Sequence, residues 1–177
     1  MSELKQWMDD EARGLAHSLA QINLNEMDAR SIGGYGLRSR AITFLETVKS
    51  ALFPALYEVD AATPGHLVTL SEERLYATAE QLKAIARDVF IGQCDRQGRE
   101  GCDRQKCKER ADGLVLDFLK ALLPLREMLT EDLRAAYDGD PAARYMEEIL
   151  LSYPSIEAVS TYRIAHELFV RGLPVVP

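Results

Sequence analysis

The sequence predicts an all-α fold in which about seven helices pack as a multi-helix bundle, in a single domain over residues 1–177. Two observations favour this fold. Apolar residues recur every three or four positions in most segments between the glycines and prolines, as on one face of a helix. No segment shows the alternation of a strand convincingly, and the sequence holds no internal repeat. A hydrophobic content of 47% in 177 residues suits one domain with a substantial core.

The first predicted helix covers residues 2–22, and its apolar face consists of Leu4, Met8, Ala12, Leu15, Leu19 and Ile22. Residues 23–35 are a predicted connection. The run Gly33-Gly34-Tyr35-Gly36 is glycine-rich, as phosphate-binding loops are, but such loops follow a strand and none is predicted here. We therefore interpret it as a plain loop. A second helix is predicted over residues 37–53, ending at Pro54.

Residues 59–66 are a predicted loop, because they contain the turn signal Pro64-Gly65. The third predicted helix begins at Thr69, whose hydroxyl is placed to form a capping box with Glu72, and it ends near Gly92. Like the two helices before it, this helix carries an apolar face that needs a partner surface.

The longest apolar face is predicted between residues 111 and 136, and it includes Leu114, Phe118, Leu122, Leu125, Leu129 and Leu133. The pattern stays in helical phase through Pro124. A proline inside a helix removes one backbone hydrogen bond and crowds the preceding turn. We therefore expect a bend at Pro124, and we expect the helix to end at Gly139.

Two more helices are predicted at the C-terminal end. Asp140 is a candidate N-cap with Pro141 as the first helical residue, because a cap carboxylate accepts hydrogen bonds from the first turn and proline is favourable there. This helix should run to about Ser152 and stop at the pair Tyr153-Pro154. The last helix should then end at Gly172.

Several segments of the chain occur in an order and at a spacing typical of one protein family. They are Asp140-Pro141-Ala142-Ala143, Glu148-Ile149-Leu150, Tyr153-Pro154, Ala158 and Tyr162-Arg163-Ile164-Ala165-His166, with Leu123-Pro124-Leu125-Arg126 and residues 132–137 upstream. These segments resemble the end of the N-terminal helical domain of bacterial serine O-acetyltransferases. Ser155 departs from the family pattern, which has glycine after the Tyr-Pro pair.

The resemblance implies an enzyme that transfers acetyl from acetyl-CoA to the hydroxyl of L-serine, giving O-acetyl-L-serine for cysteine biosynthesis. In that family the acetyl-CoA site and the catalytic histidine lie in a left-handed parallel β-helix of hexapeptide repeats. This sequence contains no six-residue apolar repeat. We therefore expect the chain to be the helical domain alone, with no catalytic residue and no bound cofactor, and we expect it to be inactive by itself.

Asp140 is the candidate substrate-binding residue. The resemblance implies that the aspartate of the Asp-Pro-Ala motif lines the serine pocket, where its carboxylate would hold the ammonium group of the substrate. Helix capping is the alternative role, and one carboxylate has enough acceptor sites for both. Arg163 and His166 are predicted to share a helical face with Val159 and Val170. We expect both to satisfy buried partners rather than to catalyse.

Cys94, Cys102 and Cys107 lie in the densely charged segment 93–110. Three thiolates and a fourth ligand hold zinc or an iron cluster in many proteins. The spacing C-x7-C-x4-C differs from the paired C-x2-4-C ligands of closed zinc sites, and no histidine follows nearby, so we predict no metal site. A redox role would require a thiol of lowered pKa, which the sequence alone does not establish, so this role stays open.

The net charge of −7 disfavours nucleic acid and anionic membranes as partners, since both would repel an acidic surface. Residues 1–10 lack the basic and apolar regions of a signal peptide, and the apolar stretch 114–125 is interrupted by Asp117 and Lys120. We therefore expect a cytoplasmic protein whose cysteines are reduced.

The resemblance also implies the partners of the full enzyme. L-serine and acetyl-CoA are its substrates, and L-cysteine is a feedback inhibitor at the serine site. The homo-oligomer is a hexamer, in which two trimers meet through their helical domains, and in relatives cysteine synthase binds the extreme C-terminus. The alternative is a non-catalytic helical module that only assembles or binds another protein.

Overall fold

The computed structural model describes residues 2–26, 34–58, 63–96, 103–174 and 176. These ranges contain eight α-helices and no strand, so the predicted all-α fold is confirmed. Parts of the predicted connections, at 27–33 and 59–62, lie outside them, as does Cys102. None of the helices in the described ranges combines the length and the hydropathy that a membrane span requires.

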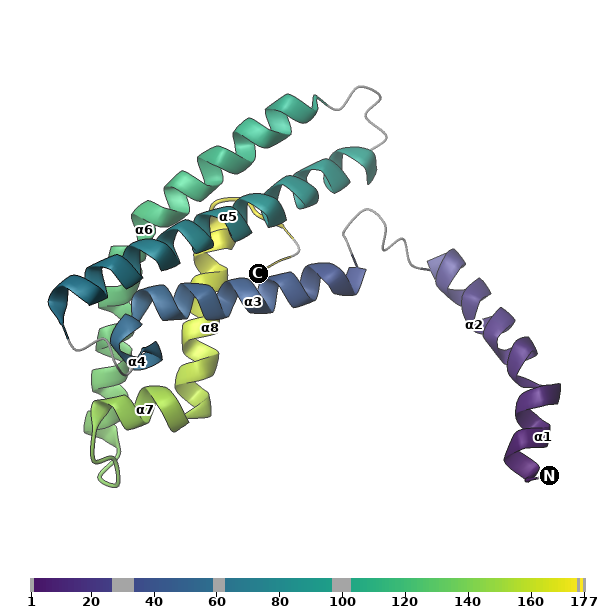
Figure 1. Cartoon of the computed structure of the whole chain (residues 1–177), viewed down its shortest axis with the longest axis horizontal. Coiled ribbons are helices and arrows are strands. Elements are labelled where there is room, and N and C mark those ends of the chain that lie inside the picture. The colour runs from purple at the N-terminus through teal and green to yellow at the C-terminus, as the bar shows by residue number, and fades with distance from the viewer. Residues whose placement is uncertain (1, 27–33, 59–62, 97–102, 175, 177) are drawn as a thin grey trace.

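The N-terminal arm consists of α1 (Glu3–Asp10) and α2 (Ala12–Glu26), which the sequence predicted as one helix. The two helices contact each other, and Figure 1 shows them standing apart from the other helices. Their large apolar side chains are between 45% and 76% exposed, and these are Leu4, Trp7, Met8, Leu15, Leu19, Ile22 and Leu24. The predicted apolar face therefore exists, but the described part of the chain does not cover it.

The helices α3 (Gly34–Leu52), α5 (Pro64–Arg96) and α6 (Arg104–Gly139) form the body of the fold. α5 contacts both α3 and α6 (Figure 1). The core forms where the three helices meet, and Phe44 of α3 and Phe118 of α6 are fully buried there with their ring centroids 5.7 Å apart. The short α4 (Pro54–Tyr57) follows α3, which ends just before Pro54 as predicted. The predicted start of α3 at residue 37 is wrong, because Gly34, Tyr35 and Gly36 belong to the first turn of α3 rather than to a loop.

Helix α6 continues through Pro124 and ends at Gly139, as the phase of its apolar residues predicted. Its buried face consists of Cys107, Ala111, Leu114, Val115, Phe118, Leu122, Leu125, Leu129 and Leu133. Proline has no backbone N–H, so the carbonyl four residues before Pro124 lacks its helical hydrogen bond. Because Pro124 is exposed, water can solvate that carbonyl. The helix changes direction along its length, as expected for an internal proline (Figure 1).

The start of α5 differs from the prediction. The helix begins at Pro64, and the Thr63 hydroxyl accepts a hydrogen bond from the His66 N–H at 3.3 Å. Thr69 lies inside the helix, where its hydroxyl donates to the Gly65 carbonyl at 3.2 Å. The predicted capping box at Thr69 is therefore wrong. The pair Pro64-Gly65 belongs to the first helical turn rather than to a loop, because proline is favourable at the first position of a helix.

The chain closes with α7 (Met146–Ser152) and α8 (Pro154–Val170), both of which contact α6. The predicted end of α7 at Ser152 is confirmed, but its predicted start at Pro141 is wrong. The end of α8 is confirmed at Gly172, which has a φ of 77°. The Gly172 N–H bonds to the Phe169 carbonyl at 2.9 Å and the Leu173 N–H bonds to the Leu168 carbonyl at 3.1 Å, a Schellman motif.

We expect Gly172→Ala to lower the free energy of unfolding by about 1–2 kcal/mol, because a Cβ disfavours the left-handed conformation that ends α8. Gly113→Ala is the matched control. Gly113 lies within α6 and a Cβ there would meet no atom within 4 Å, so this variant should gain about 0.5–1 kcal/mol. Urea unfolding of the two variants measures both effects, and shifts of the same sign would contradict the account of the α8 terminus.

Candidate functional site

Asp140 is the first residue after α6, and its backbone is extended at φ −118° and ψ 102°, as the following proline favours. Its carboxylate oxygen Oδ1 accepts a hydrogen bond from the Ala142 N–H at 2.8 Å. The side chain thus closes a turn over Pro141 and Ala142 instead of capping a helix. The predicted helix-cap role is wrong, because the next helix begins only at Met146.

Tyr153 is the second partner of Asp140. Its hydroxyl donates to Asp140 Oδ2 at 2.5 Å, from the single residue that separates α7 from α8. The Tyr153 hydroxyl and the Ala142 N–H stabilise the ionised carboxylate and lower the pKa of Asp140 below its ordinary value. The same hydrogen bond raises the pKa of Tyr153 to about 12. At neutral pH the pair therefore consists of a carboxylate and a protonated phenol.

The segment between Asp140 and α7 is held at several points. The Ala143 N–H bonds to the Asp140 carbonyl at 3.1 Å, and the Arg144 N–H bonds to Glu148 Oε2 at 3.1 Å. The Tyr137 hydroxyl donates to the Arg144 carbonyl at 3.4 Å. Asp140 is thus fixed relative to α6, α7 and the start of α8, yet its side chain stays partly exposed. A carboxylate has about four acceptor positions, so this one can still bind a cation.

Arg163 makes a bidentate ion pair with Asp132, with Nε 2.5 Å from Oδ2 and Nη2 2.7 Å from Oδ1. This pair joins α8 to α6. His166 is exposed and stacks on Tyr162, with the ring centroids 5.9 Å apart and the planes inclined by 22°. The prediction that His166 satisfies buried partners is therefore wrong. The buried face of α8 lies elsewhere, at Ile156, Ser160, Ile164 and Leu168, and Val170 is exposed.

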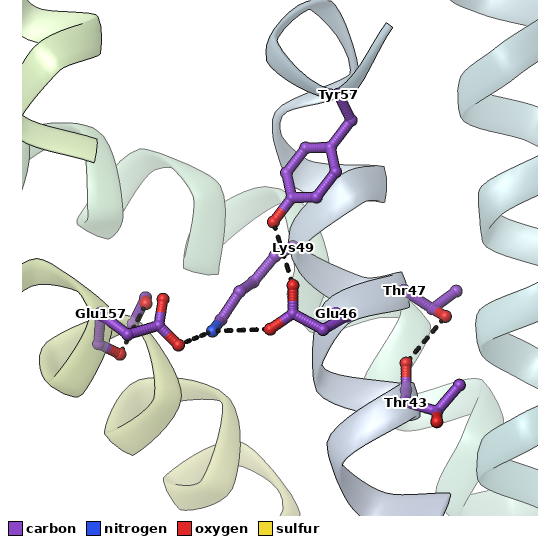
Figure 2. A network of polar contacts seen from close by, with 7 residues as sticks. Thr43, Glu46, Thr47, Lys49, Tyr57 and Glu157 are labelled. Carbon is purple, nitrogen blue, oxygen red and sulfur yellow. Dashed lines mark hydrogen bonds and ion pairs between the residues drawn. The ribbon is translucent and has the colours of Figure 1, made fainter. Parts of the chain in front are cut away.

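A buried lysine in α3 is a feature that the sequence analysis missed. Lys49 Nζ pairs with Glu157 of α8 and lies 3.4 Å from Glu46 Oε1 (Figure 2). Only 7% of the Lys49 side chain is exposed, whereas Glu46 and Glu157 are 55% and 62% exposed. The available signal was its position, because Lys49 lies four residues after Leu45 and three before Leu52 on the apolar face of α3.

A cavity of about 240 Å³ lies beside this lysine, lined by Lys49, Phe53, Leu56, Tyr57, Leu150, Leu151, Glu157 and Ser160. The Tyr57 hydroxyl donates to Glu46 Oε2 at 3.5 Å (Figure 2). Burial, followed by the carboxylates of Glu46 and Glu157, raises the pKa of Tyr57 to about 12. Tyr57 is therefore protonated at neutral pH and cannot act there as a base, so we assign this network to holding α3 against α8.

Cys94 and Cys107 are brought together by the α5–α6 hairpin, with their Sγ atoms 3.6 Å apart. In the described ranges no group of three or more histidine, cysteine or carboxylate side chains is placed to bind a metal. Cys102 lies outside those ranges. The absence of a metal site thus stays a prediction.

The known proteins that match this chain all carry the same family name. No family model matches the chain. A plasmid serine acetyltransferase of Synechococcus elongatus is 32% identical over 135 residues, which are 74% of this chain and 41% of that protein. A second serine acetyltransferase of S. elongatus is 45% identical over 49 residues, and that of Bacillus subtilis is 46% identical over 44 residues, about a quarter of this chain and 20% of each relative. The predicted resemblance is confirmed, and the chain spans less than half the length of these relatives.

We expect Lys49→Met to leave the free energy of unfolding unchanged or to raise it by about 1 kcal/mol, because an apolar side chain of similar length replaces a buried charge. Glu157→Gln should lower it by about 1–3 kcal/mol, because the buried ammonium then keeps only Glu46. In the Lys49→Met background, Glu157→Gln should cost less than about 0.5 kcal/mol. Urea unfolding of the three variants tests this. A loss above about 2 kcal/mol in Lys49→Met alone would mean that the ion pair is a net source of stability.

Proposed function

Because this chain is a homologue of the serine acetyltransferases, we propose that it is the helical domain of an enzyme that transfers acetyl from acetyl-CoA to L-serine in cysteine biosynthesis. The observation that carries this proposal is the state of the Asp140 carboxylate. Its carboxylate is ionised, partly exposed and fixed by two neutral donors, Tyr153 and the Ala142 N–H. Asp140 binds the ammonium group of the substrate L-serine.

The electrostatics of the site support an ammonium ligand. Each hydrogen bond to Asp140 comes from a neutral group, so neither removes the negative charge of the carboxylate. Charge-assisted hydrogen bonds to an ammonium group are stronger than neutral ones. L-cysteine carries the same ammonium group as L-serine, so it competes for Asp140 as a feedback inhibitor.

The remaining chemistry of acetyl transfer requires a base for the serine hydroxyl and donors for the oxyanion. His17, His66 and His166 are all exposed, so none of them lies in a site that excludes water. We assign the base and the acetyl-CoA site to parts of the longer enzyme outside this chain. In this proposal the chain is inactive by itself and holds no cofactor. The proposed location of the full enzyme is the cytoplasm.

Assembly is the second role, and the exposed N-terminal arm supports it. The apolar side chains of α1 and α2 would remain in contact with water in an isolated chain, at a cost of about 25 cal/mol per Å² of apolar surface. Burial against other copies removes this cost, and we propose a hexamer of two trimers that meet through the helical domains. The same arm favours the second candidate function, a non-catalytic assembly or regulatory module. Cysteine synthase is a further proposed partner of the full enzyme.

Asp140→Asn in the full-length enzyme tests the substrate-binding role. Asparagine retains the acceptor for the Ala142 N–H, so the fold should persist, but the charge that binds the serine ammonium is lost. We expect kcat/KM for serine to fall roughly ten- to hundredfold, with acetyl-CoA binding unchanged. Asp138→Asn, an exposed carboxylate at the end of α6, is the matched control and should leave the kinetics unchanged.

Steady-state kinetics and thermal melting of both variants decide the matter. Unchanged serine kinetics in Asp140→Asn would restrict the residue to its role in the turn. A large fall in melting temperature, with normal kinetics per folded enzyme, would mean that the charge of Asp140 stabilises the folded state instead of binding the substrate.

The arm is tested by replacing Leu15, Leu19 and Ile22 together with glutamine. These side chains are about half exposed, so the chain should keep its helical content while its assembly into oligomers is lost. Val68→Gln with Tyr76→Gln, two exposed apolar positions on α5, is the matched control and should assemble normally. Sedimentation equilibrium measures the mass. An unchanged oligomer in the arm variant would exclude the arm as the assembly surface.

A further inference from the structure

The proposed function leaves one close contact between reactive side chains unused. Cys94 lies in the last turn of α5 and Cys107 in the first turn of α6, and their sulfur atoms are 3.6 Å apart. Cys107 is only 8% exposed, whereas Cys94 is partly exposed at the surface of the core. The two thiols thus belong to different helices but meet side by side, with one of them accessible to a small reagent.

We propose that Cys94 and Cys107 are a site of reversible oxidation, at which a disulfide joins the end of α5 to the start of α6. This inference does not depend on the proposed enzymatic role. A disulfide requires a sulfur separation of about 2.0 Å, so the two Sγ atoms must approach by roughly 1.5 Å from their present contact. Side-chain rotation at the partly exposed Cys94 supplies this approach.

The start of α6 holds Cys107 in place. Asp103 caps α6 by accepting hydrogen bonds from the Gln105 N–H at 3.0 Å and the Lys106 N–H at 3.3 Å. The Cys107 N–H bonds to the Asp103 carbonyl at 3.1 Å, which places Cys107 at the start of the regular helix. Both cysteines also contact the hydrophobic core. Cys107 is thus held at the capped start of α6, and Cys94 lies in the last turn of α5, an arrangement that raises the effective concentration of the two thiols for one another.

The oxidant in this proposal is a hydroperoxide. The Cys94 thiolate attacks the terminal peroxide oxygen, the O–O bond breaks, and an alcohol (or water, from hydrogen peroxide) leaves with Cys94 as a sulfenic acid. The Cys107 thiolate then attacks the Cys94 sulfur, the S–S bond forms, and water leaves. In sum, two thiols and one hydroperoxide give one disulfide, one alcohol and one water. Exchange with a small dithiol returns both thiols and oxidises that reagent.

The disulfide would act on the part of the hairpin that contacts the end of α8. The Arg110 guanidinium lies 3.9 Å from the centre of the Phe90 ring, and its Nη2 donates to the Gly172 carbonyl at 3.2 Å. Phe90 precedes Cys94 by one helical turn, and Arg110 follows Cys107 by nearly one turn. A covalent bond between the two helices would therefore restrain this contact, and the oxidised protein should melt at a higher temperature than the reduced one.

The experiment treats the purified chain with hydrogen peroxide and then blocks remaining thiols with an alkylating reagent. We expect the intact mass before alkylation to fall by two hydrogen atoms, and the non-reducing peptide map to contain a peptide that links Cys94 to Cys107. Dithiothreitol should reverse both changes. Cys102→Ser is the matched control and should give the same linkage, whereas Cys94→Ser and Cys107→Ser should each abolish it.

Several results would overturn the proposal. A map in which Cys102 is a partner in the dominant linkage would assign the oxidation to another pair. Alkylation of both Cys94 and Cys107 after peroxide treatment, with no loss of mass, would show that the contact does not react. Near-stoichiometric zinc in the purified protein, with thiols protected from peroxide until a chelator removes the metal, would identify these thiolates as ligands instead. The linkage is read from wild type and Cys102→Ser, so misfolding of a serine variant at 94 or 107 does not affect it.

Discussion

Burial of one continuous face of α6 is the constraint on which the rest of the structure depends. Phe118 in its first half packs with Phe44 of α3, and Leu125, Leu129 and Leu133 in its second half belong to the same buried cluster as Ile149 of α7 and Ile164 of α8. Because the helix continues through Pro124, the body of the fold and the C-terminal helices share one core. The position of Asp140 follows directly, since it is the residue at which this helix ends.

Three carboxylates illustrate how the surroundings of a charge determine its use. Asp132 forms an ion pair with Arg163, which joins α8 to α6. Glu157 forms an ion pair with the buried Lys49, which joins α8 to α3. In both cases a cation of the chain already neutralises the carboxylate. Asp140 differs, because its partners are a phenol and a backbone N–H. Its charge is stabilised without being neutralised, which is the condition for binding a cationic group from outside.

The sequence was sufficient where one helix face or one local signal decided the outcome. The spacing of apolar residues predicted that α6 continues through Pro124, and Gly172 predicted the end of α8. It failed at Asp140-Pro141, because an aspartate that accepts a backbone N–H two residues later can begin either a turn or a helix. It failed at His166 because the buried face of α8 is set by its contact with α6, which sequence spacing on α8 alone does not reveal. The apolar face of α3 indicates that Lys49 lies towards the core, but its pairing with Glu157 depends on how α3 packs against α8. The meeting of Cys94 with Cys107 likewise depends on the packing of two helices.

The pKa of Asp140 is the measurement that tests this account most directly. Carbon-13 NMR titration of its carboxyl group should give a value below the ordinary aspartate pKa of about 3.9, and Tyr153→Phe should raise it towards that value by removing the largest cause of the shift. Because the folded-state pKa is lowered, this contribution to stability is present at neutral pH and is lost as the pH falls through the folded-state pKa. Tyr145→Phe, at an exposed tyrosine of the same segment, should leave the titration unchanged. Equal pKa values in wild type and Tyr153→Phe would contradict the claim that the Tyr153 hydroxyl stabilises the charge of the Asp140 carboxylate.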